Sequence, residues 1–456
     1  MDLAGKKVLI VGFGKTGEAL AGFLVGRGAR VTVSEIRDQA RLGRKMALWR
    51  SRGVLFETGR HLPLTFLKAE LIIPSPGAAA LAEIKAAEKA GVPVISEIEL
   101  AARHLKGTIV GITGTNGKST TATLAHKILK EAGFRSFLAG NIGTPLISFV
   151  ERSRDQHVYV TEISSFQLEH LETFRAAVSV FLNISQNHLD WHGTFEGYFR
   201  AKKRLLQTQS PDDAAILNAD DRMLDRLARQ IPAQTYFFSR RRKVRRGCFL
   251  RDGWIVFRDG GEEERLMKPG EIPLPGLHNI ENVMAAALVG RILGAGIRTM
   301  RSSIRSFSGL EHRLEPVLSL RGVDFINDSK ATTVDATIKA VQSFKKRIVL
   351  ILGGRDKGAD FRLLRRPLRR IVKKVILLGE SKTKIATALR GVVPAAEART
   401  LGEATRLAFA AARRGEIVLL APACTSFDMF TNFEARGRAF KREVRKLKDS
   451  LQGTRQ

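Results

Sequence analysis

Residues 111–121 read GITGTNGKSTT and directly follow a short apolar run at 108–110. A glycine-rich loop that ends in Lys-Ser typically binds phosphate, with backbone N–H groups pointing inward and the lysine, here Lys118, as a counter-charge. The strict pattern requires its first glycine at position 112, where Ile112 stands. The stretch is therefore either a chance glycine loop or a phosphate loop of a variant type, and the surrounding residues must distinguish the two.

Acidic and imidazole side chains follow two apolar runs downstream of this loop. Glu162 ends the run HVYVTE, and a strand that carries one acid toward a phosphate loop is typical of a Mg²⁺ site; an ordinary acid at a strand end is the alternative. His188, Asp190 and His192 crowd the loop after the run 176–185. A lone histidine is more often a structural hydrogen-bonding residue, but three such groups at the carboxyl end of a strand indicate a ligand site.

A second glycine turn lies near the N-terminus. An apolar run at 8–11 leads into Gly-x-Gly-x-x-Gly at 12–17, then a helix and a strand at 30–33, and Glu35 follows the last glycine by 18 residues. This pattern predicts a βαβ unit that binds a diphosphate at a helix N-terminus, and it fits NAD and other nucleotides equally. The stretch PSPG at 74–77 follows another apolar run and predicts a ligand loop at the carboxyl end of that strand.

The spacing of apolar residues divides the chain into three segments. Leu124, Ala125, Ile128 and Leu129 recur at helical spacing after the phosphate loop, so this loop lies between a strand and a helix. From about Leu310, the apolar runs RIVLIL, VILLG and EIVLLAP alternate with basic helical stretches in a parallel α/β pattern. The predicted fold is α/β with three domains: a Rossmann-like domain at 1–97, a central P-loop ATPase-type domain with a parallel sheet at 98–309, and a Rossmann-like domain at 310–456.

Composition narrows the class of protein. With 456 residues, of which 44% are hydrophobic, the chain is long enough for two or three domains with ordinary cores. Cys248 and Cys424 are far apart and give neither a disulfide framework nor metal-ligand spacing. The N-terminal apolar stretch is too short for a secretory signal, and no apolar run approaches the ~20 residues that span a bilayer. We expect a soluble, cytoplasmic protein without a membrane span.

The net charge of +31 is concentrated in three basic runs, at 240–246, 365–374 and 441–448. Such runs fit binding to nucleic acid or to an anionic membrane surface. They also fit the solvated faces of a basic protein that handles anionic substrates. Aromatic residues that could stack on bases are not interleaved with these runs, so the sequence favours the solvated faces.

Two asparagines complete the motifs. Asn279 and Asn282, in LPGLHNIENVMAA at 274–286, stand three residues apart at a predicted helix start, where Asn279 is a candidate N-cap and the pair can hydrogen-bond a base edge.

The chain resembles the Mur ligases in these stretches and, in the same order over nearly its whole length, in EISSFQLE, NISQNHLDWHGTFEGYFRAKKRLL, LNADD, GLEHRLE, INDSKATTVDAT and APACTSFDMFTNFEARG. This family writes its loop TGTNGK followed by Ser or Thr, so the missing glycine at 112 fits the family's pattern.

The resemblance implies roles for individual residues of this chain. The catalytic residues that it implies are Lys118, Glu162, His188 and Lys202. The ATP phosphates, base and ribose would be bound by Gly114, Thr115, Asn116, Gly117, Lys118, Ser119, Thr120, Asn279, Asn282, His312, Arg313 and Asp328. One Mg²⁺ ion would be held by Ser119 and Glu162, and a second by His188 and a carbamylated lysine. The family places that lysine in an Ala-Lys-x-Arg context, which selects Lys202, with Lys203 as the alternative.

The same resemblance places two further substrates. D-Glutamate would contact Lys330, Thr332, Lys357, Ser426 and Phe433. The UDP-sugar would contact the turns Gly14, Lys15, Thr16, Gly17 and Ser75, Pro76, Gly77, together with Glu35, Arg37 and Asn141. Three positions depart from the family's common residues: Asn187 stands for Asp, Trp191 for Arg and Ala421 for Ser. These differences leave the main ligands intact and affect the local hydrogen bonding.

Within the family, the chain is most similar to the members that join D-glutamate to UDP-N-acetylmuramoyl-L-alanine in peptidoglycan precursor synthesis. That reaction consumes ATP and proceeds through an acyl phosphate, with two Mg²⁺ ions, or Mn²⁺ in their place. It implies small-molecule substrates, a monomer, and no obligatory nucleic acid. Two alternatives stay open: a sibling ligase of the Mur or folylpolyglutamate type, and a basic P-loop protein that binds nucleic acid. An NAD dehydrogenase is disfavoured further, because it leaves the phosphate loop unexplained.

Overall fold

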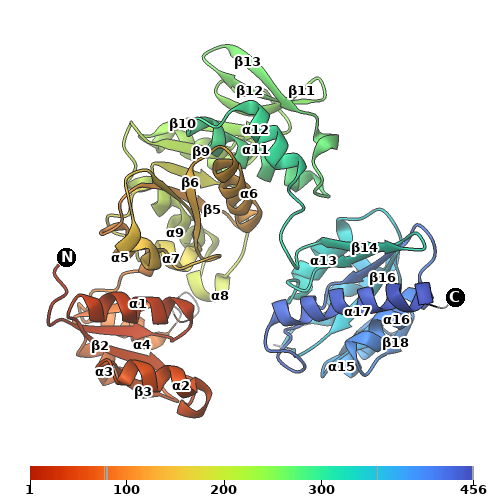
Figure 1. Cartoon of the computed structure of the whole chain (residues 1–456), viewed down its shortest axis with the longest axis horizontal. Helices are drawn as coiled ribbons and strands as arrows, with labels where there is room; N and C mark the ends of the chain where they lie inside the picture. Colours follow the sequence, from red (N-terminus) through yellow and green to blue (C-terminus); the bar gives the residue numbers. More distant parts are fainter. Residues whose placement is uncertain (76–77, 79–80, 357, 454–456) are drawn as a thin grey trace. The chain divides into compact units, whose positions relative to one another are not determined.

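The computed structural model describes residues 1–75, 78, 81–356 and 358–453. The chain divides into two compact units: an N-terminal unit of Met1–Ile272 with Leu277–Ser306, and a C-terminal unit of Pro273–Gly276 with Phe307–Gln456. Two sheets lie in the N-terminal unit and a third lies in the C-terminal unit (Figure 1). All three sheets contain parallel strands joined by helices, which confirms the predicted α/β class. The domain boundary predicted at residues 309 and 310 lies close to the division between the units and stays a prediction.

The first sheet has four parallel strands in the order β3-β2-β1-β4. Its elements are β1 (Lys7–Val11), α1 (Lys15–Gly26), β2 (Arg30–Glu35), α2 (Gln39–Arg50), β3 (Leu55–Thr58), α3 (Pro63–Leu67), β4 (Leu71–Pro74) and α4 (Ala82–Lys89). Residues 8–11 of β1 and the whole of β4 are continuous buried apolar runs, as expected for parallel strands that are covered on both faces. Gly17 lets α1 pack against the preceding turn, because a Cβ there would stand 2.2 Å from the Gly12 carbonyl oxygen.

The second sheet has nine strands in the order β13-β12-β11-β10-β9-β8-β5-β7-β6. Its first half contains α5 (Glu97–Ala102), β5 (Thr108–Thr113), α6 (Lys118–Glu131), β6 (Arg135–Gly140), η1 (Leu146–Arg152), β7 (His157–Glu162), α7 (Ser165–Glu169), β8 (Val178–Phe181), α8 (Leu189–His192) and α9 (Phe195–Gln207). Strand β5 pairs with β7 and β8 in parallel, so the phosphate loop after β5 lies beside the carboxyl ends of both neighbours.

In the other half of this sheet, the sequence predicted the strand at 214–221 and a helix start near Asn279, and the antiparallel strands were not anticipated. This half contains β9 (Ala214–Asn218), α10 (Arg222–Leu227), η2 (Ala228–Gln230), β10 (Gln234–Ser239), β11 (Gly247–Arg251), β12 (Trp254–Asp259), β13 (Glu262–Met267), η3 (Pro269–Glu271), α11 (Leu277–Ile292) and α12 (Ile297–Arg305). Strands β11, β12 and β13 form an antiparallel meander at the sheet edge. The basic run 240–246 is the connection between β10 and β11.

The third sheet has six strands in the order β14-β15-β19-β16-β17-β18, and only the pair β14 and β15 is antiparallel. Its elements are β14 (Glu315–Leu320), β15 (Val323–Asn327), α13 (Val334–Gln342), β16 (Ile348–Gly353), η4 (Phe361–Leu364), α14 (Arg365–Ile371), β17 (Val372–Leu378), α15 (Lys382–Leu389), β18 (Ala395–Glu397), α16 (Leu401–Ala411), β19 (Ile417–Leu420) and α17 (Phe433–Gly453). Among the described residues, no helix is both long enough and apolar enough to span a membrane.

Candidate active site

The phosphate loop has the strand–loop–helix context that its chemistry requires. Strand β5 ends at Thr113 and α6 begins at Lys118, so the loop N–H groups lie at a helix N-terminus. Gly117 has φ +86°, and a Cβ there would stand 2.2 Å from Oδ1 of Asn282. Glycine is therefore required at 117 for its left-handed backbone and for the close approach of Asn282. The chance-loop interpretation is disfavoured by this geometry.

Hydrogen bonds to the segment after β8 hold the loop in place. The Thr115 hydroxyl donates to the Ser185 carbonyl (3.2 Å) and accepts from the Ser185 amide (3.0 Å). The Asn116 amide donates to Oδ1 of Asn183 (2.9 Å), whose Nδ2 returns a bond to the Asn116 carbonyl. Lys118 Nζ donates to the carbonyls of Gly114 (2.8 Å) and Thr115 (3.1 Å), so the ammonium lies over its own loop.

Glu162 lies at the carboxyl end of β7 and is buried beside the loop strand. Its Oε1 accepts a hydrogen bond from Nδ2 of Asn141 at 2.7 Å. Its Oε2 is buried and has no hydrogen-bond partner in the part of the chain that the structure describes. A buried carboxylate oxygen without a partner is costly unless a cation meets it, and oxygen is the ligand that Mg²⁺ prefers. The donor set therefore fits a divalent cation, and it places Asn141, which the resemblance assigns to the UDP-sugar, directly against the acid.

Lys202 is the buried lysine of the site. It is 1% exposed, its Nζ donates to the Thr113 hydroxyl at 3.1 Å, and it lies 5.0 Å from the ring centroid of Tyr198. Burial, with the positive charge of Lys118, lowers the pKa of Lys202 well below its usual range against the opposing pull of Glu162. A lysine of lowered pKa has more of the neutral amine that can add to CO₂ and form a carbamate. Lys203 instead donates to Gln230 at the surface.

The loop after β8 brings His188 next to this cluster. The exposed His188 ring packs on Phe166 and Tyr198, with centroid distances of 5.0 and 6.2 Å. A ring nitrogen of His192 lies 3.0 Å from the Ser165 hydroxyl, and Trp191 Nε1 donates to Glu169 at 2.7 Å. His192 also packs on Tyr198, with a centroid distance of 5.3 Å, so both histidines lie between α7 and Tyr198. The side chain of Asp190 lies outside the described residues.

The two asparagines of α11 complete the site in the N-terminal unit. Asn282 Nδ2 donates to Oδ1 of Asn279 (3.0 Å), and the Thr121 hydroxyl donates to Oδ1 of Asn282 (3.4 Å). Both amides are buried. The N-cap interpretation of Asn279 is wrong, because α11 already begins at Leu277. Ser119 and Thr120, in the first turn of α6, are buried beside the loop.

The N-terminal turns meet at the carboxyl ends of β1 and β4. Gly14 caps α1 without a side-chain hydrogen bond, and Lys15 and Thr16 form its first turn, so the first N–H groups remain available to an anion. The Ser75 hydroxyl donates to the Gly12 carbonyl at 3.0 Å and joins the two turns. Pro76 and Gly77 lie outside the described residues.

Glu35 has a structural partner in the same region. Its carboxylate accepts from the Phe13 amide (2.7 Å) and from the Arg37 guanidinium (2.8 Å). Burial disfavours the charged form, but these hydrogen bonds outweigh it and lower the pKa of Glu35 to about 2. The acid is therefore ionised and holds Arg37 over the glycine turn, and a ribose hydroxyl would share it with Arg37.

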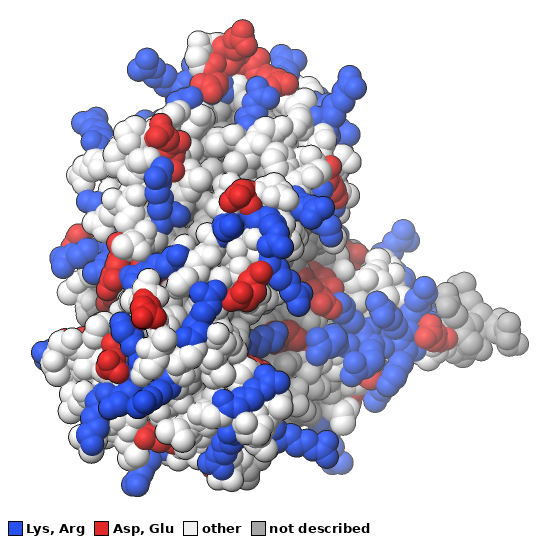
Figure 2. Space-filling view, turned by 60° about the vertical axis from the view of Figure 1, so that its left-hand side comes forward, with Lys and Arg blue, Asp and Glu red and all other residues white. Residues whose placement is uncertain are grey.

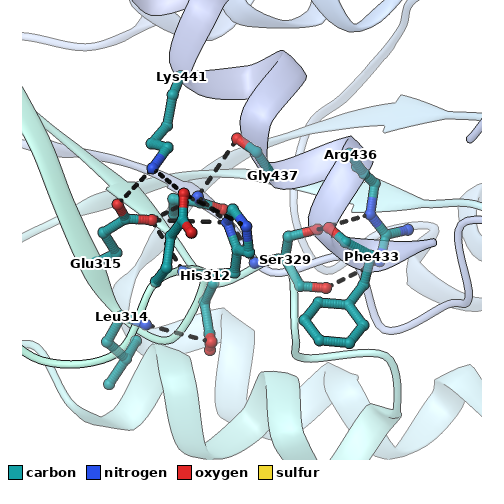
Figure 3. Close-up of polar contacts among 11 residues, drawn as sticks. His312, Leu314, Glu315, Ser329, Phe433, Arg436, Gly437 and Lys441 are labelled. Carbon is teal, nitrogen blue, oxygen red and sulfur yellow. Dashed lines mark hydrogen bonds and ion pairs between the residues drawn. The ribbon is translucent and has the colours of Figure 1, made fainter. Parts of the chain in front are cut away.

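A polar cluster in the C-terminal unit surrounds His312 (Figure 3). Asn327 Nδ2 donates to Nδ1 of His312 at 2.9 Å, so the proton of the neutral ring lies on Nε2. Nε2 is buried and has no hydrogen-bond partner among the described residues, although Oε1 of Glu311 lies 3.7 Å away. Burial lowers the pKa of His312 against the pull of Glu311 and Glu315. Lys441 of α17 donates to Glu311 (2.6 Å) and Glu315 (2.8 Å) and ties α17 to the start of β14.

The residues that the resemblance assigns to D-glutamate lie around the same cluster. Lys330 Nζ is 5.7 Å from the ring centroid of Phe433, and the rings of His312 and Phe433 are 6.3 Å apart. Ser426 is buried, Thr332 is half-buried next to Lys330, and Arg313 follows His312. Lys357 lies outside the described residues.

Asp328 and Arg436 are the two buried charges of this region. Asp328 accepts from the Leu314 amide (3.3 Å), and burial raises its pKa to about 6. Arg436 is 2% exposed, and burial lowers its pKa to about 10. Its guanidinium donates to the hydroxyl and carbonyl of Ser329 and to the carbonyls of Cys424 and Thr425, all within 3.2 Å. Arg436 therefore joins the loop after β15 to the loop after β19.

Comparison with known sequences covers nearly the entire chain. Residues 6–96 match the Mur ligase MurD-like N-terminal domain, 112–290 the Mur ligase middle domain, and 312–424 the Mur ligase glutamate ligase domain. A UDP-N-acetylmuramoylalanine–D-glutamate ligase of Acidobacterium capsulatum is 48% identical over 444 residues, which cover 97% of this chain and 96% of the relative. The chain belongs to the Mur ligase family. A relative of the same name from Koribacter versatilis is 45% identical over 98% of this chain and 99% of its own.

Solved Mur ligases share the fold. The UDP-N-acetylmuramate–alanine ligase MurC of Thermotoga maritima has a TM-score of 0.60 at 19% identity, over 98% of this chain and all of its own. A pseudomurein peptide ligase type C of Methanothermus fervidus has a TM-score of 0.58 at 18% identity, over 97% of this chain and all of its own. The predicted family and the predicted enzyme class are thus confirmed, and Mur ligases use ATP.

The structure brings most of the predicted Mur ligase residues together in groups. In the N-terminal unit, Lys118, Glu162, Lys202 and Asn282 lie around the phosphate loop, and in the C-terminal unit His312 and Phe433 lie side by side. Sequence reasoning missed Tyr198, whose hydroxyl donates to Thr115, and Arg436. Both had a signal: Tyr198 precedes Lys202 by one helical turn, and Arg436 follows Phe433 by three residues.

Proposed function

We propose that this Mur ligase joins D-glutamate to UDP-N-acetylmuramoyl-L-alanine at the expense of ATP, in peptidoglycan precursor synthesis. The observation that carries the proposal is the group formed by Glu162 and Lys202 beside the phosphate loop. Glu162 has an unpartnered buried oxygen and Lys202 has a strongly lowered pKa. The choice of D-glutamate is supported by relatives of that name, which match over nearly the whole chain.

The chemistry starts from a carboxylate that resists attack by an amine. The alanyl carboxylate oxygen attacks the γ-phosphorus of ATP, the bond from phosphorus to the bridging oxygen breaks, and ADP leaves. The D-glutamate amine then attacks the carbonyl carbon of the acyl phosphate, loses a proton, and expels inorganic phosphate. The loop amides and Lys118 would orient the γ-phosphoryl group and neutralise the charge that spreads over its oxygens. Phosphoryl transfer of this kind requires no protein nucleophile.

Two Mg²⁺ ions belong to this proposal, with Mn²⁺ as a substitute. The Ser119 hydroxyl and Glu162 would hold one ion, and His188 with a carbamate on Lys202 would hold the other. The ions would neutralise phosphate charge. Carbamylation converts a lysine side chain, whose ammonium form would be repelled by a cation, into an anionic ligand. The Thr113 hydroxyl already accepts a hydrogen bond from Lys202 at the end of β5, so it would orient the same side chain after modification.

The other substrates are proposed to occupy the remaining groups. The UDP moiety would bind at the α1 N-terminus and the turn that contains Ser75, and Asn279 with Asn282 would face the adenine. D-Glutamate would bind between Lys330, Ser426 and Phe433. The enzyme would act in the cytoplasm, where its nucleotide substrates are made, as a monomer that needs no nucleic acid.

Phosphate release from ATP tests the function directly. We expect release only when UDP-N-acetylmuramoyl-L-alanine and D-glutamate are both present, with little release for L-glutamate or L-lysine. Lys118→Ala should abolish release and leave binding of the UDP-substrate nearly intact in calorimetry. Equal turnover with L-lysine would replace the proposed substrate by that of a sibling ligase. Loss of UDP-substrate binding in Lys118→Ala would contradict the separate placement of the two nucleotide sites.

A further inference from the structure

The surface at the amino-terminal ends of the strands of the third sheet is strongly basic. Strands β16, β17 and β19 start in register, because Ile348 pairs with Val372 and with Ile417. The chain segments that lead into the strands of this sheet therefore lie together at its amino-terminal edge. We call this surface the basic edge and define it by nine exposed residues: Arg321, Lys345, Lys346, Arg347, Arg369, Arg370, Arg390, Arg413 and Arg414.

Few acids oppose these cations. Lys346 pairs with Asp324 at 2.7 Å, and Glu416 is engaged by Lys373 at 3.0 Å. Within the described part of the chain, no carboxylate lies within ion-pair distance of the other eight side chains of the basic edge. A surface with this charge density attracts anions over a distance of about one Debye length, ~8 Å at physiological ionic strength.

Within the C-terminal unit, the basic edge lies at the opposite ends of the strands from the polar cluster around His312. Asp328, Lys330 and Ser426 follow β15 and β19 at their carboxyl ends, whereas the basic edge precedes the strands. Helix α17 begins at Phe433 beside the site and runs for 21 residues, so its last turns, with the exposed Arg442, Arg445 and Lys448, lie well away from that site. Figure 2 shows Lys and Arg side chains spread over the visible surface, with Asp and Glu side chains among them.

The kind of anionic partner follows from what accompanies the charge. Single-stranded nucleic acid is bound by stacking bases on exposed aromatic rings. Among the described residues of the C-terminal unit, the exposed large aromatic side chain is Phe427, on the loop after β19 at the opposite edge. An anionic bilayer requires only dense positive charge on a broad surface. The edge spans the starts of several adjacent strands, each about 4.8 Å from the next, and is broad in this sense.

We propose that the basic edge adsorbs the protein to an anionic membrane surface, with phospholipid headgroups such as phosphatidylglycerol as the ligand. Adsorption is electrostatic and reversible, because the edge presents cations and the structure describes no helix that could span a bilayer. The cluster around His312 and Phe433 faces away from the lipid and stays open to substrates. The cations also follow helices α13 to α16, whose C-terminal dipoles favour positive charge. If these cations served only to compensate the helix dipoles, removing them would lower stability and would not change lipid binding.

Co-sedimentation of the full-length protein with vesicles tests this surface. We expect binding to phosphatidylglycerol vesicles, none to phosphatidylcholine vesicles, and loss of binding as salt is raised. The test variant is Arg347→Gln, Arg370→Gln, Arg413→Gln, which removes one cation before each of β16, β17 and β19. The control variant is Arg241→Gln, Lys243→Gln, Arg245→Gln in the β10–β11 connection, which removes the same charge from exposed side chains of the N-terminal unit. The test variant should bind about 100-fold more weakly than wild type, and the control should bind nearly as wild type.

Ligation activity without vesicles should be unchanged in both variants, which shows that they fold. Equal loss of vesicle binding in the two variants would overturn the assignment to the basic edge and leave only net charge. No binding to phosphatidylglycerol vesicles at low salt would overturn the membrane proposal. Binding to single-stranded RNA that vesicles fail to compete away would replace the membrane by nucleic acid as the partner.

Discussion

Replacing Asp328 by Asn should make the C-terminal unit more stable and the enzyme inactive. Asp328 is buried and its pKa is raised from 3.8 to about 6, so near neutral pH the folded state carries a carboxylate that the interior disfavours. A shift of this size corresponds to about 3 kcal/mol of unfolding free energy, at 1.36 kcal/mol per unit. The asparagine oxygen can still accept from the Leu314 amide. Its two N–H donors cost about 1 kcal/mol where they find no acceptor, which leaves a net gain of about 2 kcal/mol.

The gain in stability of Asp328→Asn over wild type must increase as the pH rises. Because the folded pKa of Asp328 is raised, the folded state binds more protons than the unfolded state between pH 3.8 and about 6. Below pH 3.8, Asp328 is protonated in both states and does not destabilise the wild-type fold. As the pH rises through about 6, the folded protein loses the stability that the protonated form provides. The asparagine that replaces the acid does not titrate in this range. The advantage of Asp328→Asn should be absent near pH 4 and complete near pH 8.

Hydrogen exchange measured by mass spectrometry can isolate the C-terminal unit. Peptides from β15, β16 and β19 should exchange more slowly in Asp328→Asn than in wild type at pH 8, by roughly 30-fold for 2 kcal/mol. Comparison of the two proteins at each pH cancels the intrinsic pH dependence of exchange. The control is Asp324→Asn, whose carboxylate pairs with Lys346 and has a lowered pKa, so this variant should exchange at the wild-type rate or faster. A difference that does not change between pH 4 and pH 8 would refute the reasoning.

Further predictions concern the buried lysine and His312. Lys202→Ala should lose most phosphate release and regain some with added formate or acetate, which can replace the carbamate anion. Lys203→Ala should retain activity. Rescue of the Lys203 variant alone would move the carbamylated position from 202 to 203. Gly437→Ala should weaken ATP binding and destabilise the C-terminal unit by about 1–3 kcal/mol, because a Cβ there would stand 2.2 Å from Nδ1 of His312. Calorimetric titration and urea unfolding check both effects, and Gly26→Ala, which has open space around its Cβ, should leave both unchanged.

Short-range patterns made much of the fold predictable. The apolar runs that became β7, β16 and β19 are buried along their length, as parallel strands require. The glycine loop was recognisable because its function depends on consecutive backbone N–H groups, which are encoded in consecutive residues. The placement of Glu162 and His188 was also predictable, because Glu162 ends β7 and His188 lies in the loop after β8, and the sheet sets the position of both.

Contacts between distant segments could not be read in the same way. Arg436 donates hydrogen bonds to Ser329, which stands more than a hundred residues earlier in the chain. The hydrogen-bond partner of His312 is Asn327, at the end of β15. The orphaned oxygen of Glu162 emerges only when burial and hydrogen bonds are known. The meander β11 to β13 was missed because the apolar runs of β11 and β12 are short and end in charged residues, and β13 begins with three glutamates.

Both units bury ionisable side chains whose charged forms the interior disfavours. Glu162 and Lys202 are buried beside the phosphate loop, and Asp328 and Arg436 are buried in the C-terminal unit without a carboxylate-to-guanidinium pair between them. Each such group costs stability in the free protein, because an interior disfavours an unpaired charge. A phosphate, a divalent cation or a substrate carboxylate would compensate these groups on binding, so part of the binding free energy arises from relief of that cost. The pKa values of Lys202 and Asp328 are shifted in the direction that a missing charged partner produces, and the same residues are those that the motifs of the sequence single out for ligand contact.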